Sequence, residues 1–142
     1  MYETNVLGTL RVTRALLPAL RAAEGIVITV GSIAGRQVYV GGAGYNAAKH
    51  AERALVEVLR QEVAADGVRV TEVDPGRVHT DFSLVRFDGD ASKADAVYDG
   101  VKSLTAEDIA EIITFAATRP AHVNIDFLQV TPVDQVGAMP KK

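Results

Sequence analysis

The sequence contains no cysteine and no tryptophan, and only three of its 142 residues are histidine. Without cysteine, neither a disulfide framework nor a thiolate metal site is possible. The histidines, His50, His79 and His122, are scattered and lack the short spacings of metal ligands. We therefore expect no metal site, and the lack of cysteine suits the reducing environment of the cytoplasm.

Long apolar runs and an excess of positive charge are also missing. Apolar segments such as 26–30 are far too short to span a bilayer. The 15 basic and 18 acidic residues are interspersed, with a net charge of -3, and form no basic stripe of the kind that binds nucleic acid. Because 48% of the residues are apolar, we expect one globular domain over residues 1–142. Its expected partners are small molecules or further copies of itself.

The spacing of apolar residues predicts alternating helices and strands. Apolar residues at helical spacing indicate helices over about 5–23, 45–65 and 105–118. Pro18 should bend or shorten the first helix, and the third opens on a capping box with Asp108. Runs rich in β-branched residues predict strands over 26–30, 68–73 and 123–130, and the alternation in the last indicates one less buried face or a position at a sheet edge. The stretch from Arg77 to about Lys102 is predicted to be a surface loop with a short helix, placed as a lid.

This order predicts an α/β fold, the C-terminal half of a Rossmann-like doubly wound parallel sheet with three strands and three main helices. In such sheets ligands bind beyond the carboxyl ends of the strands. Ser32 and Gly76 follow the first two strands, so we expect the chemistry there.

Four polar residues indicate a function only when they are considered together. Ser32 after a strand is commonly a cap, and Tyr45 and Lys49, one helical turn apart, are commonly a surface pair. Together with Asn5 upstream and Pro75-Gly76 downstream, however, they resemble the catalytic tetrad of the short-chain dehydrogenase/reductase family. Matching segments follow the family's order over the chain: 5–8, 31–35, 45–49 and 75–76.

The residue types suit the chemistry that this resemblance implies, reversible hydride transfer between a nicotinamide cofactor and a secondary alcohol or ketone. A hydroxyl acid must lie beside the substrate oxygen, and Tyr45 is the candidate. A phenol has a reference pKa of about 10, and a cation one helical turn away favours the phenolate. Lys49 would supply that cation.

The remaining roles come from the resemblance alone. Ser32 would polarise the substrate oxygen, and Asn5 would hold a water that links Lys49 to solvent. NADP or NAD would be held at its nicotinamide end by a set of residues common to the family: Tyr45, Lys49, Pro75, Gly76, Val78 and Thr80.

The C-terminal part is similar to a narrower subgroup, the NADP-dependent 3-hydroxy acid or serine dehydrogenases and related carbonyl reductases. The matching segments are 104–110, 119–126 and 132–135. Within them, we expect His122 and Asn124 to make structural hydrogen bonds near a strand or a subunit contact rather than to touch substrate.

The resemblance also implies features that this sequence does not contain. Family members begin with a strand and a glycine-rich turn that binds the pyrophosphate at a helix N-terminus. The sequence has no such turn, so the pyrophosphate and adenine sites are absent, and we expect the isolated chain to be inactive. The alternative to an enzyme is a truncated fragment that persists through self-association, since relatives form dimers or tetramers through the helices near 5–23 and 45–65.

Overall fold

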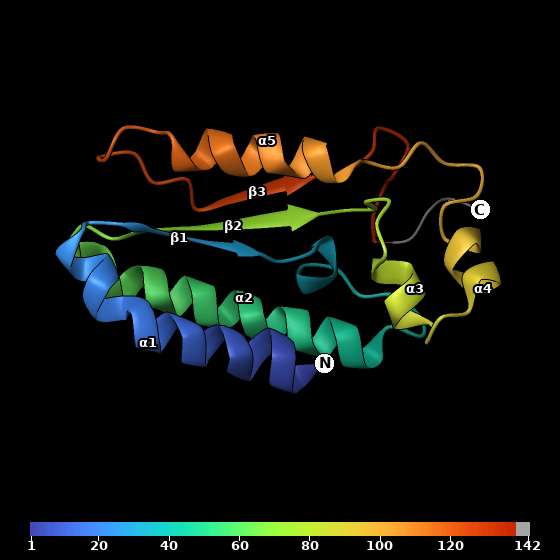
Figure 1. The fold of residues 1–142 in the computed structure, drawn as a ribbon, viewed down its shortest axis with the longest axis horizontal. Coiled ribbons are helices and arrows are strands. Elements are labelled where there is room, and N and C mark those ends of the chain that lie inside the picture. Colours follow the sequence, from blue (N-terminus) through green and yellow to red (C-terminus); the bar gives the residue numbers. More distant parts are fainter. Residues whose placement is uncertain (139–142) are drawn as a thin grey trace.

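The computed structural model describes residues 1–138 and has three layers (Figure 1). Three parallel strands form the central sheet in the order β1-β2-β3: Ile26–Val30, Arg69–Pro75 and Phe127–Val130. Helices α1 (Thr9–Ala22) and α2 (Ala43–Val63) cover one face, and α5 (Ala106–Ala117) covers the other. This confirms the predicted α/β class, the three main helices and the edge position of the third strand.

The strands end together at one edge of the sheet. Val30 pairs with Val73, and Val73 pairs with Leu128, so the three carboxyl ends point the same way (Figure 1). Beyond this edge lie two short helices in the predicted loop, α3 (Phe82–Arg86) and α4 (Ala91–Ala96). The edge and the two helices enclose the space where a ligand of such a sheet is expected.

An apolar cluster joins α2 to the amino-terminal part of the sheet. Val56 and Val63 of α2 are buried against Val68 and Val70, and Leu17 and Leu20 of α1, with Val27 and Leu59, pack around them. After α2, a short 3-10 helix, Ala64–Asp66, leads to Gly67, whose φ of 71° suits glycine and marks the predicted stop.

The third strand is shorter than predicted. Regular pairing begins only at Phe127, because the Asn124 side chain occupies the partner groups of β2. Its Oδ1 accepts a hydrogen bond of 2.8 Å from Val70 N, and its Nδ2 donates to Val70 O at 3.3 Å. Asn124 therefore substitutes for a strand backbone, which confirms the structural role expected of it.

The first helix starts with a π-helical turn, Glu3–Gly8, and continues through Pro18 to Ala22, so the proline does not end it. The capping box of α5 is present, since the Asp108 N–H donates to the Thr105 hydroxyl and Thr105 N–H donates to the Asp108 carboxylate. Among residues 1–138, no helix is both long and apolar enough to cross a membrane.

Candidate active site

A cavity of about 890 Å³ lies at the carboxyl ends of the strands, between the sheet and the helices α3 and α4. All eight residues that the sequence predicted for the site line it: Asn5, Ser32, Tyr45, Lys49, Pro75, Gly76, Val78 and Thr80. They come from four separate stretches of the chain, which the parallel sheet brings to one edge. Their individual roles stay predictions.

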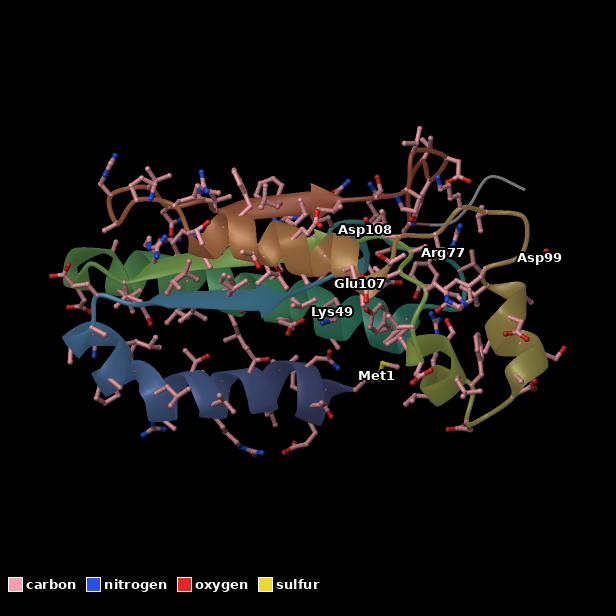
Figure 2. All side chains as sticks on the ribbon, turned by 45° about the horizontal axis from the view of Figure 1, so that its top comes forward. Met1, Lys49, Arg77, Asp99, Glu107 and Asp108 are labelled. Carbon is pink, nitrogen blue, oxygen red and sulfur yellow. The ribbon has the colours of Figure 1, made fainter. Side chains whose placement is uncertain are left out.

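Lys49 reaches from α2 to the end of β1 and is buried. Its Nζ donates to the carbonyl of Val30 at 3.1 Å and to Oε2 of Glu52 at 2.6 Å. Glu52, three residues further along α2, is also buried, so the ammonium is held inside the protein by a carboxylate and a carbonyl. Two of the three N–H donors of Lys49 are thereby used, and one is left for a ligand. Figure 2 shows Lys49 near the tip of the β1 arrow.

Asn5 lies in the π-helical turn, a local geometry that is frequent at functional sites. Its side chain donates to Met1 O at 2.9 Å, and no direct hydrogen bond joins it to Lys49. Its carbonyl accepts a hydrogen bond of 2.8 Å from the hydroxyl of Thr9, which also lies 3.3 Å from Glu52 Oε1. Asn5 is therefore linked to the Lys49 ion pair through Thr9.

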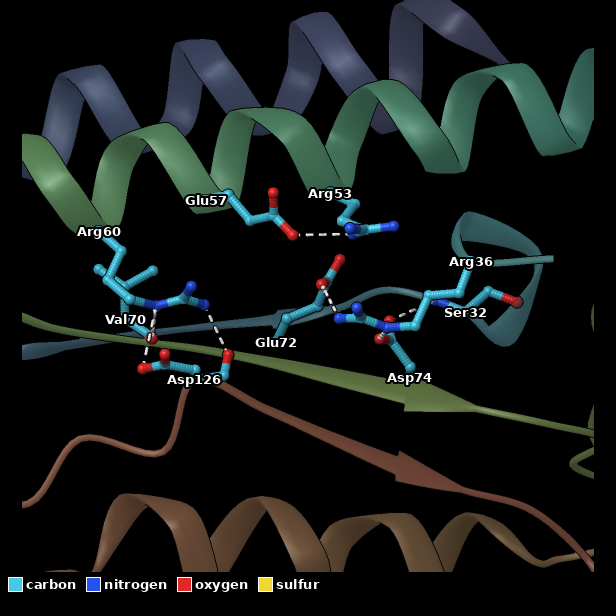
Figure 3. Close-up of polar contacts among 9 residues, drawn as sticks. All are labelled: Ser32, Arg36, Arg53, Glu57, Arg60, Val70, Glu72, Asp74 and Asp126. Atoms are coloured by element: carbon cyan, nitrogen blue, oxygen red, sulfur yellow. Dashed lines mark hydrogen bonds and ion pairs between the residues drawn. The ribbon is translucent and has the colours of Figure 1, made fainter.

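Ser32 follows β1 and caps the 3-10 helix Ile33–Gly35, its hydroxyl accepting a hydrogen bond of 3.1 Å from Ala34 N. Its own N–H donates to Oδ1 of Asp74 at 3.1 Å. The Arg36 guanidinium pairs with the second oxygen of Asp74 and, at 2.9 Å, with Glu72 (Figure 3). The backbone of Ser32 is thus fixed by an ionic cluster of Arg36, Glu72 and Asp74 that sequence reasoning did not identify.

The two acids of this cluster are almost fully buried, with 1–2% of each side chain exposed. The pKa of Glu72 is raised from 4.5 to about 7: burial is the largest cause, the neighbouring Asp74 also raises the value, and Arg36 lowers it. A Cβ atom at Gly31 would lie 2.3 Å from Asp74 Oδ1, so this acid occupies the space beside a residue without a side chain.

Tyr45, in the first turns of α2, faces the short helices that cover the cavity. Its ring lies 5.6 Å from that of Phe82 in α3, centroid to centroid. The Arg86 guanidinium lies 5.8 Å from the Tyr45 ring centroid. Tyr98 ties the covering segment together, since its hydroxyl accepts a hydrogen bond of 2.8 Å from Ser83. This segment therefore covers the cavity, as predicted for a lid.

The segment after β2 presents backbone groups to the cavity. Arg77 N donates to Gln135 Oε1 at 2.7 Å, and a Cβ atom at Gly76 would lie 2.4 Å from the same oxygen. In the bridge between Val78 and Leu104, His79 N donates to Leu104 O and Leu104 N donates to Arg77 O. The Val78 N–H therefore has no backbone partner among residues 1–138. A free amide donor beside a close-packed glycine fits a ligand that carries a carboxamide.

Sequence reasoning missed the residues that support the site: Arg36, Glu52, Glu72, Asp74 and Arg86. A signal existed for three of them. Glu52 is an acid three residues after Lys49 on a buried helix face, and Glu72 and Asp74 alternate on a strand whose other residues are mainly apolar. Arg36 and Arg86 lie in loop and lid segments, where spacing does not indicate direction.

A parallel α/β sheet with serine, tyrosine and lysine around a cavity at its carboxyl edge places this chain among the doubly wound folds that bind ligands beyond the strand ends. The chain belongs to the short-chain dehydrogenase family, whose model, described as short chain dehydrogenase, matches residues 1–91.

Three similar proteins illustrate this membership. An uncharacterized oxidoreductase of Mycobacterium tuberculosis is 59% identical over 139 residues, covering 97% of this chain and 55% of the relative. An NADP-dependent 3-hydroxy acid dehydrogenase of Schizosaccharomyces pombe is 49% identical over 97% of this chain and 54% of its own length. A solved closed form of serine dehydrogenase complexed with NADP+ superposes with a TM-score of 0.94 at 41% identity, over 100% of this chain and 58% of that one. The chain thus spans about half the length of the curated relatives it matches.

Proposed function

We propose that this chain supplies the catalytic part of an NADP-dependent dehydrogenase that interconverts a secondary alcohol and a ketone. The observation that carries the proposal is the meeting of Ser32, Tyr45 and Lys49 on one cavity at the carboxyl ends of β1 and β2. The names of the similar proteins, a 3-hydroxy acid dehydrogenase that uses NADP and a serine dehydrogenase complexed with NADP+, support the reaction and the cofactor.

In this proposal the deprotonated oxygen of Tyr45 accepts the hydroxyl proton of the alcohol during oxidation, and the resulting phenol returns it to the carbonyl oxygen during reduction. A bound cofactor would supply the hydride chemistry at the substrate carbon, as NADP+ for oxidation and as NADPH for reduction. Ser32 donates a hydrogen bond to the same oxygen and stabilises the charge that develops on it. Lys49 places a positive charge one helical turn from Tyr45, and its remaining N–H donor is available to a cofactor hydroxyl.

The nicotinamide end of the cofactor would meet Gly76, Val78 and Thr80. The Val78 N–H is free of backbone partners, and the Thr80 hydroxyl accepts a hydrogen bond of 3.3 Å from Phe82 N, which leaves its own proton to donate. Both groups suit a carboxamide. The pyrophosphate and adenosine need donors beyond those of this cavity, because they require the helix N-terminus of a glycine-rich turn.

The test is a chimaera in which this chain replaces the matching segment of the similar serine dehydrogenase, so that a complete cofactor site is assembled. We expect the chimaera to reduce NADP+ in the presence of a 3-hydroxy acid, as followed by the absorbance of NADPH. Tyr45→Phe should lower kcat by at least about 100-fold, the size of general acid-base catalysis, and leave NADP+ affinity nearly unchanged.

Tyr39→Phe is the matched control, because Tyr39 also lines the cavity but has no assigned proton-transfer role. It should keep most of the activity. A chimaera that folds and binds NADP+ but transfers no hydride, or a Tyr45→Phe variant with activity close to that of the parent, would show that the proposal is wrong.

A further inference from the structure

Glu52 is a buried acid directly behind the lysine of the candidate active site. Its Oε2 lies 2.6 Å from Lys49 Nζ, and only 4% of the residue is exposed. Glu52 does not line the cavity, whose described lining contains no aspartate or glutamate. It is therefore out of reach of a ligand in the cavity and can affect a reaction there only through Lys49.

The fold does not require an acid at position 52. Glu52 lies on the buried face of α2 between Ala48 and Val56, where an apolar side chain would pack. Buried ion pairs contribute little net stability compared with apolar residues of similar volume. Its other oxygen, Oε1, has only the Thr9 hydroxyl at 3.3 Å as a partner within residues 1–138. The reason for the acid is therefore the charge that it brings to Lys49.

This charge also acts on Tyr45. Tyr45 and Lys49 lie one helical turn apart on α2 and line the same cavity. A lone ammonium favours the phenolate, but an adjacent carboxylate cancels part of its field, because opposite charges act on a third group with opposite signs. Protons leave two interacting groups in steps that belong to the pair rather than to either residue. A negative charge beside the pair moves the first step to higher pH.

Cations approach the pair from the segments that cover the cavity. The Arg86 guanidinium lies 5.8 Å from the Tyr45 ring centroid. Arg77 and Lys93 also line the cavity, and Lys93 pairs with Asp90 at 2.8 Å. These cations favour the phenolate, as the lysine does. The opposing charge therefore comes from the carboxylate behind the lysine.

Further charged groups face Glu52 from the sheet and from α2. The pKa of Glu72 on β2 is raised from 4.5 to about 7, with burial as the largest cause and Asp74 as the next. Glu52 also raises this pKa, while Arg36 and Arg53 lower it. Among these acids, Glu52 is the one in hydrogen-bond contact with the lysine of the site within residues 1–138.

We propose that Glu52 acts on the reaction through Lys49, as a positioning residue whose negative charge raises the pH at which the Tyr45–Lys49 pair loses its first proton. The proposal rests on the function proposed above and adds a residue outside the four that the sequence predicted for catalysis. The protonated pair is the form that gives a proton to a carbonyl oxygen. Glu52 therefore widens the pH range in which the site is ready for reduction.

Two substitutions at position 52 separate charge from shape. Glu52→Gln keeps the size and an oxygen that accepts from Lys49 but removes the charge, whereas Glu52→Asp keeps the charge and shortens the side chain. NMR of the 142-residue chain with isotope-labelled tyrosine and lysine follows both members of the pair, with signals assigned by Tyr45→Phe and Lys49→Arg. We expect the first titration step to move lower by about one pH unit in Glu52→Gln and to stay within about 0.3 unit of the parent in Glu52→Asp.

The chimaera with serine dehydrogenase gives a second measurement, the pH at which its oxidation rate is half-maximal. Glu52→Gln should lower this midpoint by the same amount. Glu57→Gln is the matched control on the same helix, because its carboxylate is 43% exposed and pairs with Arg53. Its midpoint should equal that of the parent. A purely structural role of Glu52 would instead lower the rate at every pH and leave the midpoint unmoved.

Removing one partner of a buried pair is destabilising, so the midpoints are measured at a temperature where circular dichroism shows each variant folded. An unmoved or higher midpoint in Glu52→Gln, or an equal shift in Glu57→Gln or Glu52→Asp, would overturn the proposal. If Glu52→Gln does not fold, Glu52→Asp decides, and a midpoint more than about half a unit from that of the parent overturns it. If the NMR shift occurs but the chimaera transfers no hydride, the charge effect stands and the proposed reaction is wrong.

Discussion

The two ends of the layer between α2 and the sheet contain different kinds of residue, apolar at one end and charged at the other. Toward the end of α2, Val56 and Val63 meet Val68 and Val70 in an apolar cluster. Toward its start, the same helix contributes Lys49 and Glu52, and the same strand contributes Glu72 and Asp74. One end is thus mainly apolar, with Arg60 donating to the Val70 carbonyl beside it, while the other buries several charges within the same helix and strand (Figure 3).

The apolar end contributes mainly to stability, and the charged end contributes mainly to the positioning of side chains. Apolar contacts stabilise the fold without fixing one orientation, because the hydrophobic effect has no direction. Buried charges gain little net free energy but become costly when one partner is removed. At the site end, such pairs hold Lys49 and the backbone of Ser32 in place. The protein therefore concentrates directional contacts where the cavity requires them.

Removing the cation of the ionic end should have the largest effect. Arg36→Met leaves Glu72 and Asp74 buried together without their shared partner, and we expect the free energy of unfolding to fall by about 3–5 kcal/mol in urea denaturation. Arg11→Met, which breaks the exposed pair with Glu3, is the control and should cost no more than about 1 kcal/mol. Similar losses for the two variants would mean that the cluster is not effectively buried.

The ionic end should also make stability depend on pH through Glu72. Because burial and the nearby Asp74 raise its pKa, to about 7 in the folded protein, the folded state holds this proton more tightly than the unfolded state, whose value is near 4.5. Its contribution to stability is complete below pH 4.5 and is lost as the pH rises to 7, up to about 3 kcal/mol. Glu72→Gln should flatten this decline, as measured by urea midpoints between pH 4.5 and 8. An unchanged slope would assign the pH dependence to other groups.

The apolar end should respond to a cavity without affecting the site. Val63→Ala deletes two methyl groups from a fully buried side chain and should cost about 2 kcal/mol. In the chimaera with serine dehydrogenase, kcat should stay close to that of the parent, because Val63 lies at the far end of α2. A clearly lower kcat at a temperature where the variant is folded would show that the two ends are coupled.

The smallest effect is expected between the two ends. Arg53 and Glu57 form an i,i+4 pair on α2, with 34% and 43% of their side chains exposed. Glu57→Gln should therefore change the free energy of unfolding by less than about 0.5 kcal/mol, with a similar midpoint in low and high salt. A loss of unfolding free energy above about 1 kcal/mol would mean that the ionic region reaches further along the helix.

The sequence predicted the elements and the site residues better than the contacts that support them. Helical spacing placed Tyr45 and Lys49 on one face of α2, and the β-branched run from Ile26 to Val30 marked β1 to the residue. Contacts between distant segments, such as Arg36 with Asp74, depend on how the chain folds back and leave no local period. The short β3 was missed for the same reason, since a side chain of Asn124 replaces backbone pairing.

The close approach of Asp74 to Gly31 makes the two positions interdependent during evolution. Any residue other than glycine at position 31 would place its Cβ on the carboxylate that receives the Ser32 amide. A single replacement there should be selected against while Asp74 is present and become tolerable only after a smaller residue stands at position 74 and the Glu72 side chain, 2.9 Å from the same Cβ, shifts aside. In relatives, we therefore expect the two positions to change together, as an epistatic pair of which one member follows β1 and the other lies in β2.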